Sequence, residues 1–264
     1  MHNARLTRRE MLRLSAAGAV GAVAGPILAG ETMNATPRTL DAADGFRGIW
    51  YWCNTMPGPY KYKYSGGLGT YCAKHIPLAW HAPNARKTFF CYGGRPAGAN
   101  RLLHVISYYD HRRGAVARPR VLMDKGTGDA HDNCTVMLDD DGHVWIFSAS
   151  HGRQRDAFIH RSVEPYGIDR FVRVRKVNFS YPQAWPVAGA GVLFLHTKYV
   201  GGHRTLCWET CTDGETFSRR RTLAAVENGH YQISNRRGKV VATAFNVHPK
   251  PGVDWRTNLY YLQT

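Results

Sequence analysis

Short apolar runs bounded by turn residues constrain the fold of this chain more than any other feature of its sequence. VWIF at 144–147 and VLFL at 192–195 have the length of β-strands rather than of helices. Turn clusters such as DDDG at 139–142 and GG at 201–202 separate successive runs. Because no long amphipathic stretch lies between the runs, the pattern predicts an all-β protein.

The spacing of these runs favours the blades of a β-propeller. Antiparallel strands that recur about every ten residues and are joined by Asp-Gly hairpins are typical of blades, and a β-sandwich is the alternative. At about four strands per blade, the expected strands make about three and a half blades, an open stack with unpaired sheet edges. We therefore expect either further strands or part of a larger ring. The expected strands are 48–52, 75–80, 87–92, 102–109, 133–138, 143–149, 157–162, 171–177, 192–197, 205–210, 220–223, 230–234, 239–245 and 258–262.

The first 30 residues have the features of a bacterial export signal. TRREMLR at 7–13 contains the pair Arg8-Arg9 and precedes a mildly apolar stretch rich in Ala and Gly. Such a segment is read by the twin-arginine export machinery. Four glycines between positions 18 and 30 argue against the alternative, a helix packed on the domain. We expect a signal at 1–30, a linker at 31–44, a partial propeller domain at 45–264, and a periplasmic or extracellular location.

The charge of the chain predicts an anionic partner. The 264 residues include 35 Lys or Arg and 19 Asp or Glu, for a formal net charge of +16, and removal of residues 1–30, which carry +3, leaves +13. A surplus of this size attracts polyanions over a long range. Nucleic acid is the usual partner of a basic domain, but for an exported protein we expect an acidic polysaccharide and no nucleic acid. A basic surface without a specific partner is the alternative.

Two further classes are excluded by the sequence. After residue 30 no apolar run reaches the roughly 18 residues of a membrane span, so we expect no stable membrane anchor. The cysteines contain no CxxC pair, which argues against a zinc ribbon, and we expect most of them to be buried as small hydrophobic residues. The six cysteines are Cys53, Cys72, Cys91, Cys134, Cys207 and Cys211.

Two histidines are placed to share a site. His131 comes just before the strand expected at 133–138, and His151 closes the strand expected at 143–149. An antiparallel hairpin returns the end of its second strand to the start of its first, so we expect His131 and His151 to lie close together. Because the chain has 13 histidines, a structural or surface imidazole is the alternative for each of them.

A second group of candidates follows the strand expected at 192–197. Lys198 and Tyr199 lead through a Gly-Gly turn to Arg204, which brings an ammonium, a phenol and a guanidinium together in a short stretch. Tyr181 is a second candidate phenol. A tyrosine at a strand end is often a packing residue, which is the alternative here.

Several segments together resemble the BNR-4-repeat proteins. These are secreted seven-bladed propellers that include ulvan lyases and related enzymes acting on rhamnose–glucuronate polysaccharides. The resemblance runs from about residue 45 to the last residue and is most specific over 129–171. It implies a sialidase-like seven-bladed β-propeller of which this chain contains about four blades. The segments are GPYKYKYSGGLGTYCAKHIPLA, KTFFCYGG, DAHDNCTVMLDDDGHVWIFSASHGRQRDAFIHRSVEPYGIDRF, LHTKY, GHYQIS, AFNVHP and RTNLYYLQT.

The resemblance also implies roles for the candidate residues. In the ulvan lyases a histidine pair with this spacing lines the cleft, a tyrosine acts as acid and base, and an arginine holds the substrate carboxylate. The implied catalytic residues are His131, His151, Tyr199 and Arg204, with Tyr181 and Arg219 as alternative choices of phenol and guanidinium. The residues expected to contact substrate are Asn133, Arg153, Lys198 and Tyr181.

The implied reaction is β-elimination across the C4–C5 bond of a uronate. Its α-proton is acidic enough only when a cation neutralises the carboxylate, and a base and an acid must then act on C5–H and O4. No cofactor is required, although a cation held by His131 and Asp132 is one option. A glycoside hydrolase on the same scaffold would need a pair of carboxylates, for which Asp129 and Asp132 are the candidates. The third alternative is a non-catalytic or degenerate propeller that binds glycan.

Overall fold

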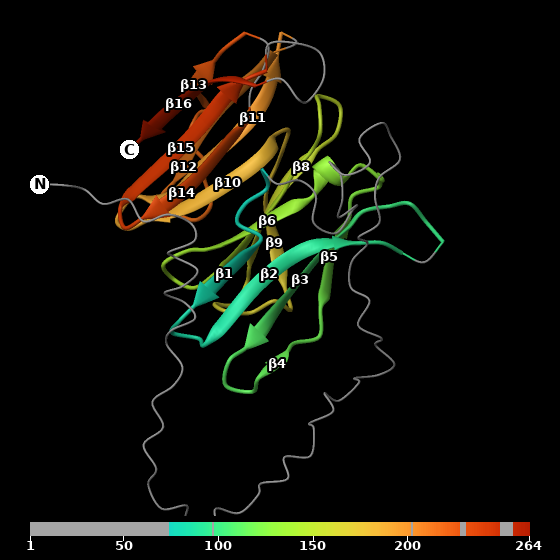
Figure 1. The fold of residues 1–264 in the computed structure, drawn as a ribbon. Helices are drawn as coiled ribbons and strands as arrows, with labels where there is room; N and C mark the ends of the chain where they lie inside the picture. Colours follow the sequence, from blue (N-terminus) through green and yellow to red (C-terminus); the bar gives the residue numbers. More distant parts are fainter. Residues whose placement is uncertain (1–73, 97, 202, 228–230, 249–255) are drawn as a thin grey trace, which may run out of the picture. The chain divides into compact units, whose positions relative to one another are not determined.

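The computed structural model describes residues 74–96, 98–201, 203–227, 231–248 and 256–264, drawn as a coloured ribbon in Figure 1. The expected export signal with Arg8 and Arg9, the linker at 31–44 and the strand at 48–52 lie outside these residues. Within the described part of the chain, strands dominate and the one helical element is a 3-10 turn, Ala130–Asp132. No described helix is long and apolar enough to cross a membrane.

Four antiparallel sheets succeed one another along the chain, as the colour sequence of Figure 1 shows. The first contains β1 (Ala79–Ala82), β2 (Lys87–Gly94), β3 (Leu103–Asp110), β4 (Ala115–Val116) and β5 (Arg120–Asp124). The second contains β6 (Cys134–Leu138), β7 (Val144–Ser148), β8 (Ala157–Ser162) and β9 (Phe171–Val177). The third contains β10 (Ser180–Val187), β11 (Gly191–Val200), β12 (His203–Cys211) and β13 (Arg221–Ala225), and the fourth β14 (Gln232–Arg237), β15 (Val240–Val247) and β16 (Thr257–Gln263).

The sheets are the blades of an incomplete propeller. Each pairs consecutive strands, and the first strands of successive sheets contact one another, β1 with β6, β6 with β10, and β10 with β14. This repetition of meandering blades side by side is the propeller arrangement. The structure therefore confirms the prediction of an all-β, four-bladed, incomplete propeller.

The β6–β7 hairpin lies between the two candidate histidines in the sequence. Its register pairs Cys134 with Ser148 and Leu138 with Val144. The Asp139 carboxylate accepts a hydrogen bond from the backbone N–H of His143 at 2.8 Å, which closes the turn. Gly142 has φ +85°, and a Cβ there would overlap the ring of Tyr166, so the turn requires glycine.

Aromatic side chains fill the space between the second and third sheets. Phe147 on β7 lies with its ring centroid 4.8 Å from that of Phe194 on β11, and Phe217 packs edge-on against both rings. All five residues of β6 and all five of β7 are buried, because neighbouring sheets cover both faces of this hairpin. Continuous apolar runs such as VWIF are therefore explained by burial on two sides.

Three described strands fall outside the ranges predicted from the sequence: β4, β5 and β10. Pro182 and Pro186 interrupt the β10 segment, and proline disfavours a strand in the middle of a sheet. The structure tolerates these prolines because β10 is the edge strand of its sheet and pairs only with β11. The register between Ser180 and Gln183 is irregular. The run expected at 75–80 is also displaced, since β1 begins at Ala79.

The described cysteines match the expectation of buried small hydrophobic residues. Cys91, Cys134, Cys207 and Cys211 are free thiols, and each is buried. Cys53 and Cys72 lie outside the described residues.

Phe147→Ala should destabilise the protein by about 3–5 kcal/mol, the usual cost of removing a buried aromatic ring. The side chain is 0% exposed and contacts rings from the neighbouring sheet, so the cavity will not collapse easily. Urea unfolding of the purified protein measures the change. Val172→Ala on β9, where the side chain is 52% exposed, is the matched control and should change stability by less than about 0.5 kcal/mol. Equal effects of the two changes would contradict the assigned core.

Candidate functional site

The structure places His131 and His151 side by side. His131 lies in the 3-10 turn before β6, and His151 directly follows β7, so the hairpin register, continued by three residues, sets them opposite each other. Their ring centroids are 4.1 Å apart and their planes differ by 11°. The expected proximity of the two imidazoles is therefore observed. Both side chains are partly exposed, 18% for His131 and 36% for His151.

A single carboxylate joins the two rings. Asp129 Oδ1 lies 2.7 Å from His131 Nδ1, and Asp129 Oδ2 lies 3.0 Å from His151 Nδ1. Burial alone would raise the pKa of Asp129, but the hydrogen bonds from His131 and His151 outweigh it and hold the pKa well below its usual range. Asp129 is therefore ionised and accepts hydrogen bonds only.

Arg155 ties this carboxylate to a second one. Its guanidinium donates to Asp129 Oδ2 at 2.7 Å and to both oxygens of Asp132 at 2.8 Å. Asp132 is fully buried, and its Oδ1 also accepts the backbone N–H of His151 at 2.7 Å. The hydrogen bonds to Asp132 contribute most to raising the pKa of Arg155 above its ordinary value. The cluster fixes the backbone on both sides of the histidine pair.

The donor atoms of Asp129, His131 and His151 lie within 4.8 Å of one another, so a metal ion is a candidate ligand by distance alone. The carboxylate oxygens are already engaged, since one receives two donors from His131 and the other receives His151 and Arg155. A cation would have to displace the Arg155 guanidinium. The donor set therefore fits an ion poorly.

Tyr181 packs beside the histidine pair and joins it to a buried imidazole. Its ring lies edge-on to His131 at 6.5 Å, 5.7 Å from His75 and 5.1 Å from Tyr231. Tyr181 has φ +52°, an uncommon value for a bulky side chain and typical of residues held in place at a site. Burial, with the charges of His131 and His151, lowers the pKa of His75 to about 3. His75 is therefore neutral, and neither of its ring nitrogens has a hydrogen-bond partner within the described residues.

Tyr199 and Arg204 complete the group on the other side. The two residues are register partners on β11 and β12, and the Tyr199 ring lies 6.2 Å from that of His151. The Arg204 guanidinium lies 5.9 Å from the Tyr199 ring and 4.7 Å from that of Tyr231. Burial acts to lower the pKa of Arg204, but the neighbouring phenols, Tyr231 foremost, outweigh it and the pKa is raised. Tyr199 Oη and Arg204 Nε are buried without a hydrogen-bond partner among the residues that the structure describes.

The residues predicted to contact substrate do not all lie in the same environment. Tyr181 lies in the group, as described above. The Lys198 ammonium binds the Asn178 side chain, and burial lowers the pKa of Lys198, with Arg153 acting in the same direction. Arg153 is exposed. Asn133 is 1% exposed and its side chain accepts the backbone N–H of Cys134, so the structure assigns it to the strand start rather than to a surface that a ligand reaches.

Four members of the site are not predicted as such by the sequence. No local pattern marks His75, Arg155 or Tyr231, and the sequence offers Asp129 only as a candidate carboxylate for hydrolysis. The one available hint for Asp129 was its position two residues before His131, the spacing of a side chain that caps a turn.

A separate polar cluster lies in the third sheet. Glu209, 1% exposed, accepts hydrogen bonds from His196 at 3.0 Å and from Arg175 and Arg220. Burial acts to raise the pKa of Glu209, but the bonds from His196 and Arg175 outweigh it and lower the pKa to about 2. Arg220 also donates to the backbone carbonyl of Asn178, so the cluster ties Glu209 to the segment that precedes β10.

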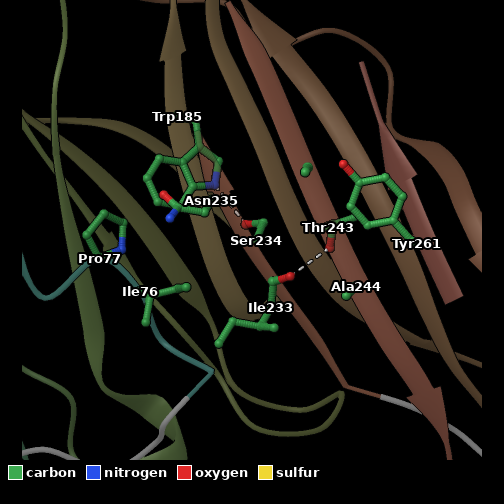
Figure 2. Close-up of a pocket in the computed structure, with 10 residues that line it drawn as sticks. Ile76, Pro77, Trp185, Ile233, Ser234, Asn235, Thr243, Ala244 and Tyr261 are labelled. Atoms are coloured by element: carbon green, nitrogen blue, oxygen red, sulfur yellow. Dashed lines mark hydrogen bonds between the residues drawn. The ribbon is translucent and has the colours of Figure 1, made fainter. Parts of the chain in front are cut away.

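The structure also contains an open cavity of about 540 Å³, shown in Figure 2. Trp185 of β10, Ile233 and Ser234 of β14, and Thr243 and Tyr261 of the next two strands line it, and the Trp185 indole donates to Ser234 at 2.8 Å. The lining is mainly apolar and includes no His, Asp, Glu, Lys or Arg. The cavity therefore lacks the imidazoles and the guanidinium of the histidine site.

Comparisons with known proteins agree with the fold. No protein-family model and no curated protein matches the sequence. Among solved structures, the chain is similar to a polysaccharide lyase described as a PL25 ulvan lyase, with TM-score 0.62 and 17% identity, covering 81% of this chain and 54% of that one. It is also similar to the polysaccharide lyase Uly1, with TM-score 0.59 and 9% identity over 81% of this chain and 59% of that one.

A third similar structure is a protein of unknown function from Dyadobacter fermentans, with TM-score 0.51 and 11% identity over 74% of this chain and 58% of that one. The chain thus spans just over half the length of the structures it matches. At these identities the likeness concerns the fold. The chain is an incomplete β-propeller whose structural neighbours include polysaccharide lyases.

Arg155→Ala should destabilise the protein by about 3–5 kcal/mol, because it leaves the buried Asp132 carboxylate without its main counter-ion. Thermal and urea unfolding at neutral pH measure the effect. Arg153→Ala, two residues away and exposed, is the matched control and should lie within about 0.5 kcal/mol of the wild type. An Arg155→Ala protein as stable as the control would contradict the assignment of Arg155 as the main counter-ion of Asp132.

Glu209→Gln should lower stability at neutral pH, and the difference from wild type should shrink in acid. The folded-state pKa of about 2 lies below the ordinary 4.5, so the carboxylate stabilises the fold above about pH 4.5 and this contribution is lost as the pH falls towards 2. At about 1.4 kcal/mol per pKa unit, the effect is roughly 2–4 kcal/mol. Urea unfolding of both proteins from about pH 7 to about pH 3 tests this. A difference that does not change with pH would contradict it.

Proposed function

We propose that this protein is an exported polysaccharide lyase that cleaves uronate-containing, ulvan-like polysaccharide by β-elimination. The observation that carries the proposal is the convergence of the stacked pair His131 and His151 with Tyr199 and Arg204. These four residues come from two adjacent sheets and present two imidazoles, a phenol and a guanidinium to one another. The lyases among the structural neighbours and the basic charge of the chain support the same substrate class.

The reaction needs a cation at the carboxylate, a base at C5 and an acid at O4. Arg204 is charged, and its guanidinium is the group that would bind the uronate carboxylate as negative charge grows there. The base takes the proton from C5, the C5–H electrons form the C4–C5 double bond, and the C4–O4 bond breaks. His151 and Tyr199, whose rings are 6.2 Å apart, are the candidate base and acid, with O4 leaving as a protonated hydroxyl.

Hydrolysis, the second candidate chemistry, has less support from the site. A glycosidase requires two carboxyl groups that face the sugar. Asp129 and Asp132 are both bound by Arg155, and Asp132 is fully buried. Neither side chain is placed as a free acid or a free base. A non-catalytic, glycan-binding propeller remains the third candidate and is distinguished by activity.

Export is part of the proposal and rests on the twin-arginine pattern around Arg8 and Arg9. A polymeric substrate outside the cell would be reached only by an exported enzyme. The anionic chain would be drawn to the protein by its long-range positive field.

The purified protein, incubated with ulvan, should produce an increase in ultraviolet absorbance from the unsaturated uronate product. Tyr199→Phe and Arg204→Gln should each lower kcat/KM by about 10²- to 10⁴-fold, since each removes a group that acts on the reacting atoms. Tyr109→Phe, on the exposed part of β3, is the control and should retain activity. Release of reducing sugar without the absorbance change would favour the hydrolase. Glycan binding that survives His131→Ala together with His151→Ala, without turnover, would favour the non-catalytic reading.

A further inference from the structure

The geometry around Asp129 determines more than the proximity of the two histidines. Asp129 Oδ1 accepts the backbone N–H of His131 at 3.0 Å and its ring Nδ1 at 2.7 Å. Oδ2 accepts the ring Nδ1 of His151 at 3.0 Å and the Arg155 guanidinium at 2.7 Å. Each oxygen thus receives two donors, which is the full acceptor capacity of a carboxylate.

An ionised carboxylate accepts but does not donate, so both ring Nδ1 atoms must carry the hydrogen. A neutral imidazole with its hydrogen on Nδ1 has its lone pair on Nε2, at the opposite edge of the ring. For His151, the more exposed ring, the ring hydrogen bond within the described part of the chain is made by Nδ1, so Nε2 has no partner there. The base-competent atom of His151 therefore points away from Asp129.

We propose that Asp129 is a positioning residue that holds both His131 and His151 as Nδ1–H tautomers, and so assigns Nε2 of His151 as the atom that acts on substrate. This inference rests on the proposed function for its consequence in catalysis, but not for the tautomers themselves. Arg155 and the 3-10 turn hold the carboxylate in turn, since Arg155 also binds Asp132 in two places. The two rings stack because one carboxylate anchors both.

A metal ion bound by Asp129 and the two imidazoles is the competing interpretation of the same atoms. It would require Nδ1 of each ring to be a lone-pair donor, which is the opposite tautomer. It would also place a dication against the Arg155 guanidinium, 2.7 Å from the shared carboxylate. The two interpretations therefore make opposite predictions about the same ring nitrogens.

Two-dimensional ¹H–¹⁵N correlation of the histidine rings in the ¹⁵N-labelled full chain tests this directly. The expected result is a protonated-type Nδ1 and an unprotonated-type Nε2 for His151 at a pH where the ring is neutral, with the signals assigned from His131→Gln and His151→Gln. Addition of ZnCl₂ should leave both signals unchanged. An Nε2–H tautomer for His151, or a stoichiometric shift of both rings by zinc, would overturn the proposal. Because this readout needs no substrate, it stands or falls separately from lyase activity.

The Asp129→Asn variant tests the role of Asp129 in catalysis. The amide accepts on one side and donates on the other, so one of the two rings must reverse its tautomer or lose its partner. We expect kcat on ulvan to fall by about 10²- to 10⁴-fold with KM changed by less than about threefold, as for other imidazoles that lose an orienting carboxylate. Asp169→Asn, an exposed carboxylate paired with Arg120, is the matched control and should retain activity.

The tautomer signals of a folded Asp129→Asn protein separate positioning from a structural role. Circular dichroism and unfolding establish that the variant is folded, and the ring spectrum then shows whether a tautomer has changed. Loss of activity with both tautomers unchanged would overturn the positioning role. Unchanged activity with a reversed tautomer at His151 would overturn the assignment of Nε2 as the acting atom.

Discussion

The antiparallel pairing of β6 with β7 is the constraint on which the rest of the site depends. Side chains alternate between the faces of a strand, so a slip of one residue would exchange the side chains that pack in one core cluster with those that pack in the other. The turn that Asp139 and Gly142 close fixes the pairing against such a slip. The same register sets His131 opposite His151, so the core that stabilises the blade also positions the two imidazoles.

The carboxylates of Asp129 and Asp132 lie where the β6–β7 hairpin ends, and their burial requires positive charge beside them. Burying Asp132 and most of Asp129 beside two imidazoles would be costly without an opposite charge. Arg155 provides it through three hydrogen bonds, and the buried Lys125 ammonium adds a second cation 3.7 Å from Asp132 Oδ2. The cluster adds little net stability compared with an apolar core of the same size, but it holds the groups around the imidazoles in one geometry. Glu209 follows the same physical rule in the third sheet without any exposed imidazole beside it, and there the result is structural only.

The part of the site that could be predicted from sequence is the part governed by local pairing. His131 and His151 follow from the β6–β7 hairpin, and Tyr199 and Arg204 from the β11–β12 hairpin, because strand alternation and turn residues are visible in a single segment. His75 and Tyr231 could not be predicted, since they reach the site from before the first described strand and before β14 through packing between sheets. β10 was missed for a related reason: prolines argue against a strand locally, and only its position at a sheet edge makes them acceptable.

The exposed face of the fourth sheet and the candidate site belong to different parts of the fold. Among the described residues, an apolar face of the fourth sheet is exposed, with Leu259 80%, Tyr261 61% and Ile233 45% accessible. The catalytic candidates, in contrast, belong to the second and third sheets, and Tyr231, the contributor nearest to that face, precedes β14. Each of these groups is positioned by contacts inside the described blades. The geometry of the imidazoles, the phenol and the guanidinium is therefore set by the second and third sheets, with Tyr231 packed against the guanidinium.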